Sequence, residues 1–206
     1  MTAAVLAGLL STCAPNVDAR TMAAVVAVES GGRPWAVHDN TTGRSYFPDS
    51  LAGAGAIAAE LAGDSLDVGL AQLNSGNFAR FGVDASAALD PCTNLRLGAS
   101  VLSDDYQREY QRTAGATEEE RRQVALRRAL SAYNSGSSTA APTYAALVVA
   151  ATSAALVRET TALADGARDS GATVRVAHAA APQMAFSAFA GATSRIFGSA
   201  FAGGGR

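Results

Sequence analysis

The chain has 206 residues, of which 49% are hydrophobic and only 17% charged, with a net charge of −2, so it can bury a core as one domain with additional material or as two small domains. The lack of a basic excess argues against a nucleic-acid or anionic-membrane surface. All 16 basic residues are Arg, which excludes lysine chemistry, and the two His and two Cys have no metal-ligand spacing, so we expect no metal and no cofactor.

The first segment, residues 1–15, allows three interpretations. It lacks the basic start and the Ala-x-Ala site of a signal peptide, and its "LSTC" is a poor lipoprotein box around Cys13. The third interpretation, the first helix of a domain, is favoured. The apolar face of that helix is made of Val5, Leu6, Leu9 and Leu10.

Residues 18–30 are predicted to form a helix whose buried face ends in a carboxyl group. Asp18 suits the N-cap and Gly31 the left-handed stop. Glu29 occupies position i+7 of an apolar stripe that begins at Met22. The helix C-terminus and burial both raise a carboxyl pKa, which makes Glu29 a candidate general acid. The alternative is a Glu whose head group reaches water past the helix end.

The rest of the chain indicates helices with few strand signals. Residues 31–48, which include His38, read as a loop with room for a short hairpin around "NTTG". Helical segments are expected after Ser50, near Phe78, after the cap Asp90, after the capping box of Thr117 and Glu120, and from Pro142 to Arg158. We therefore predict an all-α domain over residues 1–158. Residues 159–206 form an Ala/Gly-rich tail that we expect to be weakly structured.

Two segments place amide side chains beside small residues. They are "GLAQLN" (residues 69–74) and "AYNSG" (residues 132–136). Gln72, Asn74 and Asn134 can bind sugar hydroxyl and N-acetyl groups, and the Tyr133 hydroxyl can reach a carboxylate. Each segment taken alone suits a helix cap or a turn equally well.

The sequence resembles the soluble lytic transglycosylase domain. It contains three motifs of that domain in the same order: Glu-Ser, then Gly-Leu-x-Gln, then Ala-Tyr-Asn-x-Gly. The resemblance covers about residues 13–150. The segments around both cysteines and "SLDVGLAQLNSGNF" are similar to the branch associated with type IV secretion and conjugation. One departure is Ala71, where many members carry Met.

This resemblance implies a goose-lysozyme-like helical fold and an activity on peptidoglycan. Glu29 would be the sole catalytic acid and base, and the product a 1,6-anhydro sugar. Gln72 and Asn74 match the family's substrate-cleft positions, and Ser30 completes its Glu-Ser pair. Tyr133 matches the tyrosine that contacts the catalytic Glu, and Asn134 matches its neighbour. All five are expected to bind substrate. The implied partners are peptidoglycan glycan strands and components of a type IV secretion or conjugation system. A monomer in the periplasm or cell envelope is expected.

Two rival functions stay open. A lysozyme-like hydrolase would need a second carboxylate to orient water, and Asp67 is the first candidate, ahead of Asp39 and Asp64. A catalytically silent, peptidoglycan-binding assembly factor would use the tail as its partner-binding segment.

Cys13 and Cys92 each fall at a predicted helix end. They suit either a disulfide or two buried free thiols. Peptidoglycan lies outside the cytoplasmic membrane, where disulfides persist, and this favours the disulfide.

Overall fold

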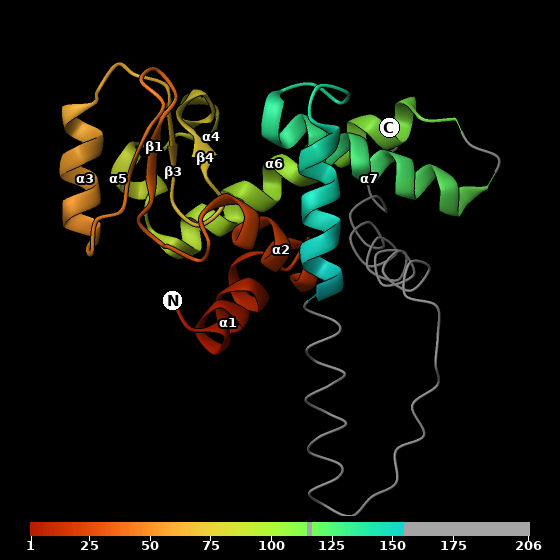
Figure 1. Cartoon of the computed structure of the whole chain (residues 1–206), viewed down its shortest axis with the longest axis horizontal. Coiled ribbons are helices and arrows are strands. Elements are labelled where there is room, and N and C mark those ends of the chain that lie inside the picture. The colour runs from red at the N-terminus through yellow and green to blue at the C-terminus, as the bar shows by residue number, and fades with distance from the viewer. Residues whose placement is uncertain (115–116, 155–206) are drawn as a thin grey trace, which may run out of the picture. The chain divides into compact units, whose positions relative to one another are not determined.

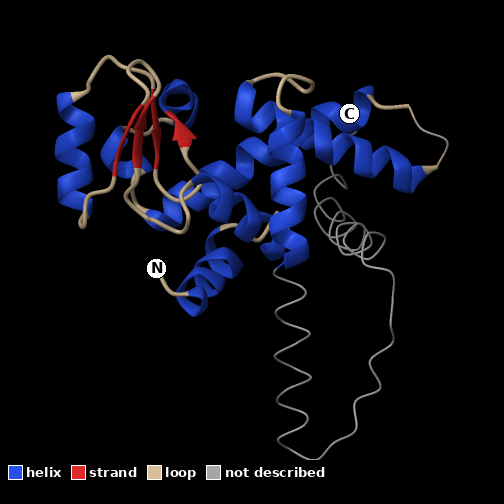
Figure 2. Cartoon of the chain, viewed as in Figure 1, coloured by secondary structure: helices blue, strands red, loops and turns tan. Residues whose placement is uncertain are grey.

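The computed structural model describes residues 1–114 and 117–154, and it is mostly helical with a small antiparallel sheet (Figures 1 and 2). The predicted helical fold class is thereby confirmed. The chain forms two compact units, Met1–Asp105 and Tyr106–Arg206. The predicted tail, and the last part of the helix expected to reach Arg158, lie outside the described residues.

Two helices open the first unit. Helix α1 (Ala3–Cys13) is capped by Thr2. Helix α2 (Ala19–Glu29) begins where the Asp18 carboxylate accepts two backbone N–H groups of the first turn, as its sequence predicts. The two helices pack against each other. The apolar stripe of α2 is buried, and the last residue of the helix lies at the edge of the core.

A four-stranded antiparallel sheet follows, in the order β2-β1-β3-β4. Its strands are β1 (Val37–Asp39), β2 (Arg44–Tyr46), β3 (Leu66–Val68) and β4 (Leu73–Asn74). The β1–β2 hairpin lies where "NTTG" leaves room for one. The loop expected at His38 is wrong: His38 lies in β1, paired with Ser45 of β2 and Asp67 of β3. The partner from β3 is distant in sequence, so local signals do not reveal the pairing.

One face of the sheet is apolar and forms the core of the first unit. It packs against helices α3 (Leu51–Glu60), α5 (Ala85–Ala88) and the first half of α6 (Pro91–Arg112) (Figure 1). The buried cluster consists of Val37, Ala54, Ala58, Leu66, Val68, Leu73, Ala88, Leu89 and Leu97. The 3-10 helix η1 (Ser75–Asn77) and the short helix α4 (Phe78–Phe81) lie between the sheet and α5 in sequence. Because side chains alternate along a strand, the residues between the core positions lie on the opposite face.

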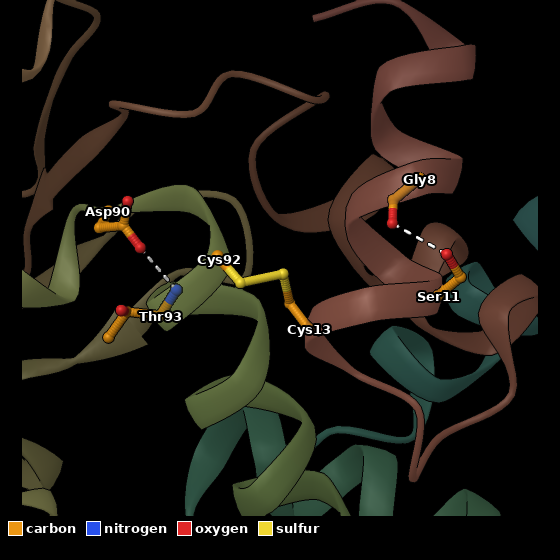
Figure 3. The surroundings of a disulfide bond; sticks show 6 residues. All are labelled: Gly8, Ser11, Cys13, Asp90, Cys92 and Thr93. Atoms are coloured by element: carbon orange, nitrogen blue, oxygen red, sulfur yellow. Dashed lines mark hydrogen bonds between the residues drawn. A yellow bond between two sulfur atoms is a disulfide. The ribbon is translucent and has the colours of Figure 1, made fainter.

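A disulfide joins Cys13 and Cys92, with the Cα atoms 5.3 Å apart (Figure 3). The bonded pair is the alternative that the sequence favours, and its Cα separation falls in the usual range of about 4.4–6.8 Å. The bridge ties the end of α1 to the first turn of α6. There the Asp90 carboxylate caps the helix through the backbone N–H of Thr93, 2.8 Å away.

The second unit contains the end of α6, helix α7 (Glu118–Ser135) and a helical segment at 142–154. The capping box of Thr117 and Glu120 is present as predicted. Buried apolar side chains of this unit include Ala125, Leu126, Ala129, Leu130, Tyr144, Ala145 and Val148. Within residues 1–114 and 117–154, no helix combines the length and the apolar character that a bilayer span requires.

Candidate functional site

Glu29 is the last residue of α2, at the end of a completely buried stripe. Met22, Val25 and Val26 of that stripe have no exposed surface, whereas Glu29 is half-buried. The helix thus places Glu29 at the edge of the core, where the residue keeps part of its surface exposed. A carboxyl group in this position can meet a ligand without unpacking the helix.

Ser30 links this helix end to the turn at residues 69–72. Its side chain is 4% exposed, and its Oγ lies 2.8 Å from the Leu70 carbonyl and 3.2 Å from the Val26 carbonyl. The structure therefore brings the Glu-Ser and Gly-Leu-x-Gln motifs together. The hydroxyl of Ser30 is used inside the protein, so its geometry suits a positioning role.

The turn itself has an unusual backbone. Gly69 has φ +79°, and a Cβ atom there would lie 2.3 Å from Nδ2 of Asn94, so only glycine fits. Gln72 has φ +46°, the one positive value at a non-glycine residue in the part of the chain that the structure describes. Such a conformation is strained and persists only where neighbouring contacts enforce it.

The two polar atoms of the Gln72 amide have different roles. Its Nε2 donates to the carbonyls of Gly69, at 2.9 Å, and Ala36, at 3.3 Å. For its Oε1, none of the described residues supplies a donor. That oxygen can accept a hydrogen bond from a ligand hydroxyl or amide while the amide nitrogen keeps the turn closed.

Asn94 of α6 locks the same turn and was missed by sequence reasoning. It is fully buried, its Oδ1 accepts the N–H of Ala71, and its Nδ2 donates to the carbonyls of Val68 and Ala88, all at 2.8 Å. The available signal was an amide residue directly before Leu95 on the apolar face of a helix. A buried amide there needs several partners, and the turn supplies them.

The outer face of the sheet carries a polar row, one residue from each strand. Cross-strand pairing aligns Ser45, His38, Asp67 and Asn74 in that order. The His38 Nδ1 lies 2.9 Å from Ser45 Oγ. The Asp67 carboxylate accepts from the amides of Asn74, at 2.7 Å, and Asn40, at 2.9 Å. Hydroxyl, imidazole, carboxylate and amide groups in a row offer donors and acceptors to a polar ligand such as a sugar.

The three candidate second carboxylates differ in their surroundings. Asp39 is fully buried, and hydrogen bonds from the Thr42 hydroxyl, chiefly, and from the backbone N–H groups of Thr41 and Thr42 lower its pKa. Asp64 is half-buried, and no described residue bonds its carboxylate. Only Asp67 is oriented on the polar face. Among the described residues, no three His, Cys, Asp or Glu side chains form a set able to hold a metal ion.

Tyr133 and Asn134 belong to the second unit, in the last turn of α7. Tyr133 is half-buried and Asn134 exposed. The chain reverses at Gly136, with φ +71°, and the buried Ser131 holds the reversal. Its Oγ donates to the Ser137 carbonyl at 2.8 Å and accepts the N–H of Ala141 at 2.9 Å. This serine was also missed from the sequence.

Comparison with known proteins is consistent with these motifs. Residues 10–145 match the transglycosylase SLT domain. The chain is 43% identical over 129 residues to protein virB1 of Agrobacterium fabrum, an alignment that covers 62% of this chain and 50% of that protein. It is 36% identical over 151 residues to type IV secretion system protein virB1 of Brucella abortus, covering 69% and 61% of the two chains. The chain thus spans about half the length of the first of these curated relatives. No solved structure matches it.

Proposed function

The chain belongs to the transglycosylase SLT domain family, and from this premise we propose that it is a lytic transglycosylase that cleaves peptidoglycan between N-acetylmuramic acid and N-acetylglucosamine. The observation that supports the proposal most directly is the hydrogen bond from Ser30 to the Leu70 carbonyl. It joins the helix end that carries Glu29 to the turn that carries Gln72, so a carboxyl group and an amide acceptor lie in one compact part of the first unit.

The proposed reaction uses the Glu29 carboxyl group twice. As an acid it donates its proton to the bridging glycosidic oxygen, and the bond to C1 breaks. As the resulting carboxylate it removes the proton from the 6-hydroxyl of the muramic acid residue, whose oxygen then attacks C1. The product is a 1,6-anhydro sugar, no water is consumed, and Glu29 returns to its starting protonation state.

Substrate binding is proposed for the remaining motif residues. The free acceptor of Gln72 and the polar row that includes Asn74 would bind sugar hydroxyl and N-acetyl groups. Tyr133 and Asn134 would contribute from the end of α7. Ser30, whose hydroxyl is buried, would act by positioning Glu29.

A second candidate reaction is hydrolysis, in which a carboxylate orients water. The orientation of Asp67 by two amide groups is the observation that favours it. The two reactions differ in their products, because the anhydro sugar is lighter than the hydrolysed sugar by one water. Mass spectrometry of the released muropeptides therefore distinguishes them.

We infer that the reaction opens the cell wall locally for a type IV secretion or conjugation apparatus, in the periplasm or cell envelope. The support is the similarity to the virB1 proteins, one of which is named as a type IV secretion system protein. The rival role, an assembly factor that binds peptidoglycan without cleaving it, would give binding to sacculi and no activity on peptidoglycan gels.

The decisive variant is Glu29→Gln, which keeps the shape of the side chain and removes the acid. We expect no measurable release of muropeptides from purified sacculi, with an unchanged circular dichroism spectrum. Asp64→Asn is the matched control, because it neutralises a half-buried carboxylate that no described residue bonds, and it should keep wild-type activity. More than a few per cent of activity in Glu29→Gln would show the single-acid mechanism to be wrong.

A further inference from the structure

Phe47 is an exposed aromatic ring in an unexpected place. At 58% exposure it is the most exposed of the large hydrophobic side chains in the described part of the chain. It directly follows the edge strand β2. The guanidinium of Arg33 lies over its ring, with Cζ 4.9 Å from the ring centroid, which is within the range of a cation–π contact. The two side chains thus form a flat, positively charged surface patch.

Arg33 is tied to the end of the helix that carries Glu29. Its backbone N–H and its Nη1 both donate to the Ser30 carbonyl, at 3.2 and 3.3 Å. No carboxylate among the described residues pairs with Arg33. Most of its guanidinium N–H groups therefore remain available to an anion, on a protein whose net charge is −2.

The helix-capping contact explains only part of this arrangement. A cation near a helix C-terminus is stabilising in itself, and the hydrogen bond from Arg33 to the Ser30 carbonyl places one there. It does not account for a ring left exposed beneath the guanidinium. A planar cation on a planar ring is instead suited to a ligand that has both a carboxylate and an apolar surface.

We propose that Arg33 and Phe47 bind the acidic peptide stem of the muramic acid residue whose bond is cleaved. This inference rests on the proposed function. The stem is attached to the same sugar whose C1 reacts at Glu29, so it must leave the site close to the end of α2, where Arg33 is tethered. The stem carries free carboxylates for the guanidinium and aliphatic side chains for the ring. The pair therefore selects glycan strands that carry stems.

The test compares two substrates and four variants. The substrates are glycan strands with intact stems and strands from which an amidase has removed the stems. The variants are Arg33→Ala, Arg33→Lys, Phe47→Ala and the control Arg44→Ala. Arg44 is also an exposed arginine over a ring, with Cζ 5.6 Å from the Tyr46 centroid, but no hydrogen bond ties it to Ser30.

For stem-bearing strands, we expect Arg33→Ala to raise KM about tenfold, the equivalent of one charged hydrogen bond, with little change in kcat. On stripped strands its KM should match that of the wild type. Phe47→Ala should show the same dependence on stems with a smaller rise, Arg33→Lys should be intermediate, and Arg44→Ala should be unchanged. An equal loss on both substrates would overturn the proposal, because Arg33 would then only hold the helix end. No loss on either would also overturn it and would leave an acidic protein partner as the ligand of the patch.

A binding measurement separates this inference from the proposed function. In the Glu29→Gln background, sedimentation with stem-bearing and stripped strands reports affinity without any turnover. If Arg33→Ala is added and the protein no longer prefers stem-bearing strands, the proposed role of Arg33 and Phe47 is supported. This holds even if the wild-type protein hydrolyses peptidoglycan or does not cleave it. An active wild type with no stem preference in this assay would refute the inference and leave the proposed function standing.

Discussion

The two segments that carry amide side chains of the family motifs are held by opposite means. The turn at residues 69–72 is fixed by Asn94 and Ser30, which lie 23 and 40 residues from their partners in the turn. The segment at the end of α7 is fixed by Ser131, whose partners Ser137 and Ala141 lie six and ten residues away. The conformation of the turn at residues 69–72 therefore depends on contacts between segments that are distant in sequence. The conformation at the end of α7 depends almost entirely on nearby residues.

This difference indicates how each segment responds to substitution. The positive φ of Gln72 is costly, and the hydrogen bonds of Ser30 and Asn94 help to hold the turn in which it lies. Loss of either contact should therefore release the turn and disturb the surroundings of Glu29. Loss of the Ser131 hydroxyl should loosen only the residues next to it. The expected effects below decrease in that order.

The largest effect is expected at Asn94. Asn94→Ala removes the three hydrogen bonds that this buried amide makes to the N–H of Ala71 and to the carbonyls of Val68 and Ala88. At about 1–3 kcal/mol for each group, the free energy of unfolding should fall by on the order of 5 kcal/mol, and cleavage should be lost. Urea denaturation followed by circular dichroism measures this. Asn94→Asp keeps the acceptor for Ala71 and should be intermediate. A loss below about 1 kcal/mol in Asn94→Ala would mean that the turn does not depend on α6.

The disulfide should matter nearly as much for stability and much less for activity. Cys92 lies two residues before Asn94, and the bridge closes a loop with a sequence separation of 79. The chain-entropy account assigns about 4 kcal/mol to a loop of this length. Replacing both cysteines with serine should lower stability by about that amount, while the folded fraction keeps its activity because the hydrogen bonds of Asn94 remain. Adding a reductant to the wild type should reproduce the loss, and the double variant should show no further response to it.

The same contrast between near and distant partners separates what the sequence predicted from what it did not. The helices that begin at Asp18, Ser50, Asp90 and Thr117 were predicted because a cap bonds to its own first turn. Strands β3 and β4 were not, because three and two residues show no periodicity and pair only through the sheet.

The candidate site divides in the same way. Glu29 was identified because a carboxyl group interrupts a visible apolar stripe. The importance of Asn94 could not be read from its neighbours, because all of its partners belong to segments that fold against α6 from elsewhere in the chain. Ser131 bonds close by, but its partners follow a chain reversal that the sequence shows only as a helix break.

A smaller effect is expected at Ser131. Ser131→Ala removes one donor and one acceptor, so stability should fall by about 1–2 kcal/mol. If Tyr133 and Asn134 bind substrate, KM should rise several-fold while kcat changes little, because Glu29 lies in the other unit. Ser138→Ala is the matched control, since its hydroxyl has no partner among the described residues. A fall in kcat without a change in KM would contradict a role confined to binding.

The smallest expected effect is on stability at acidic pH. It compares the two units directly. In the first unit, hydrogen bonds from the Thr42 hydroxyl and nearby backbone N–H groups lower the pKa of Asp39. In the second, the Tyr110 hydroxyl and then Arg122 and Arg121 lower the pKa of Glu118. A carboxyl group whose pKa is lower in the folded state than in the unfolded state stabilises the protein above the unfolded value. That stability is lost as the pH falls toward the folded value, here below about pH 4.

Asp39→Asn and Glu118→Gln should each lower the free energy of unfolding at neutral pH and leave it less changed at the acid end, which flattens the acid limb of the stability curve measured by urea denaturation between pH 7 and pH 2.5. Asp39 is fully buried in the hairpin, whereas solvent screens the exposed Glu118, so the flattening should be greater for Asp39→Asn. The two changes should add in the double variant, because the carboxylates lie in different units. A curve that stays equally steep in Asp39→Asn would show that the hairpin bonds of Asp39 survive protonation.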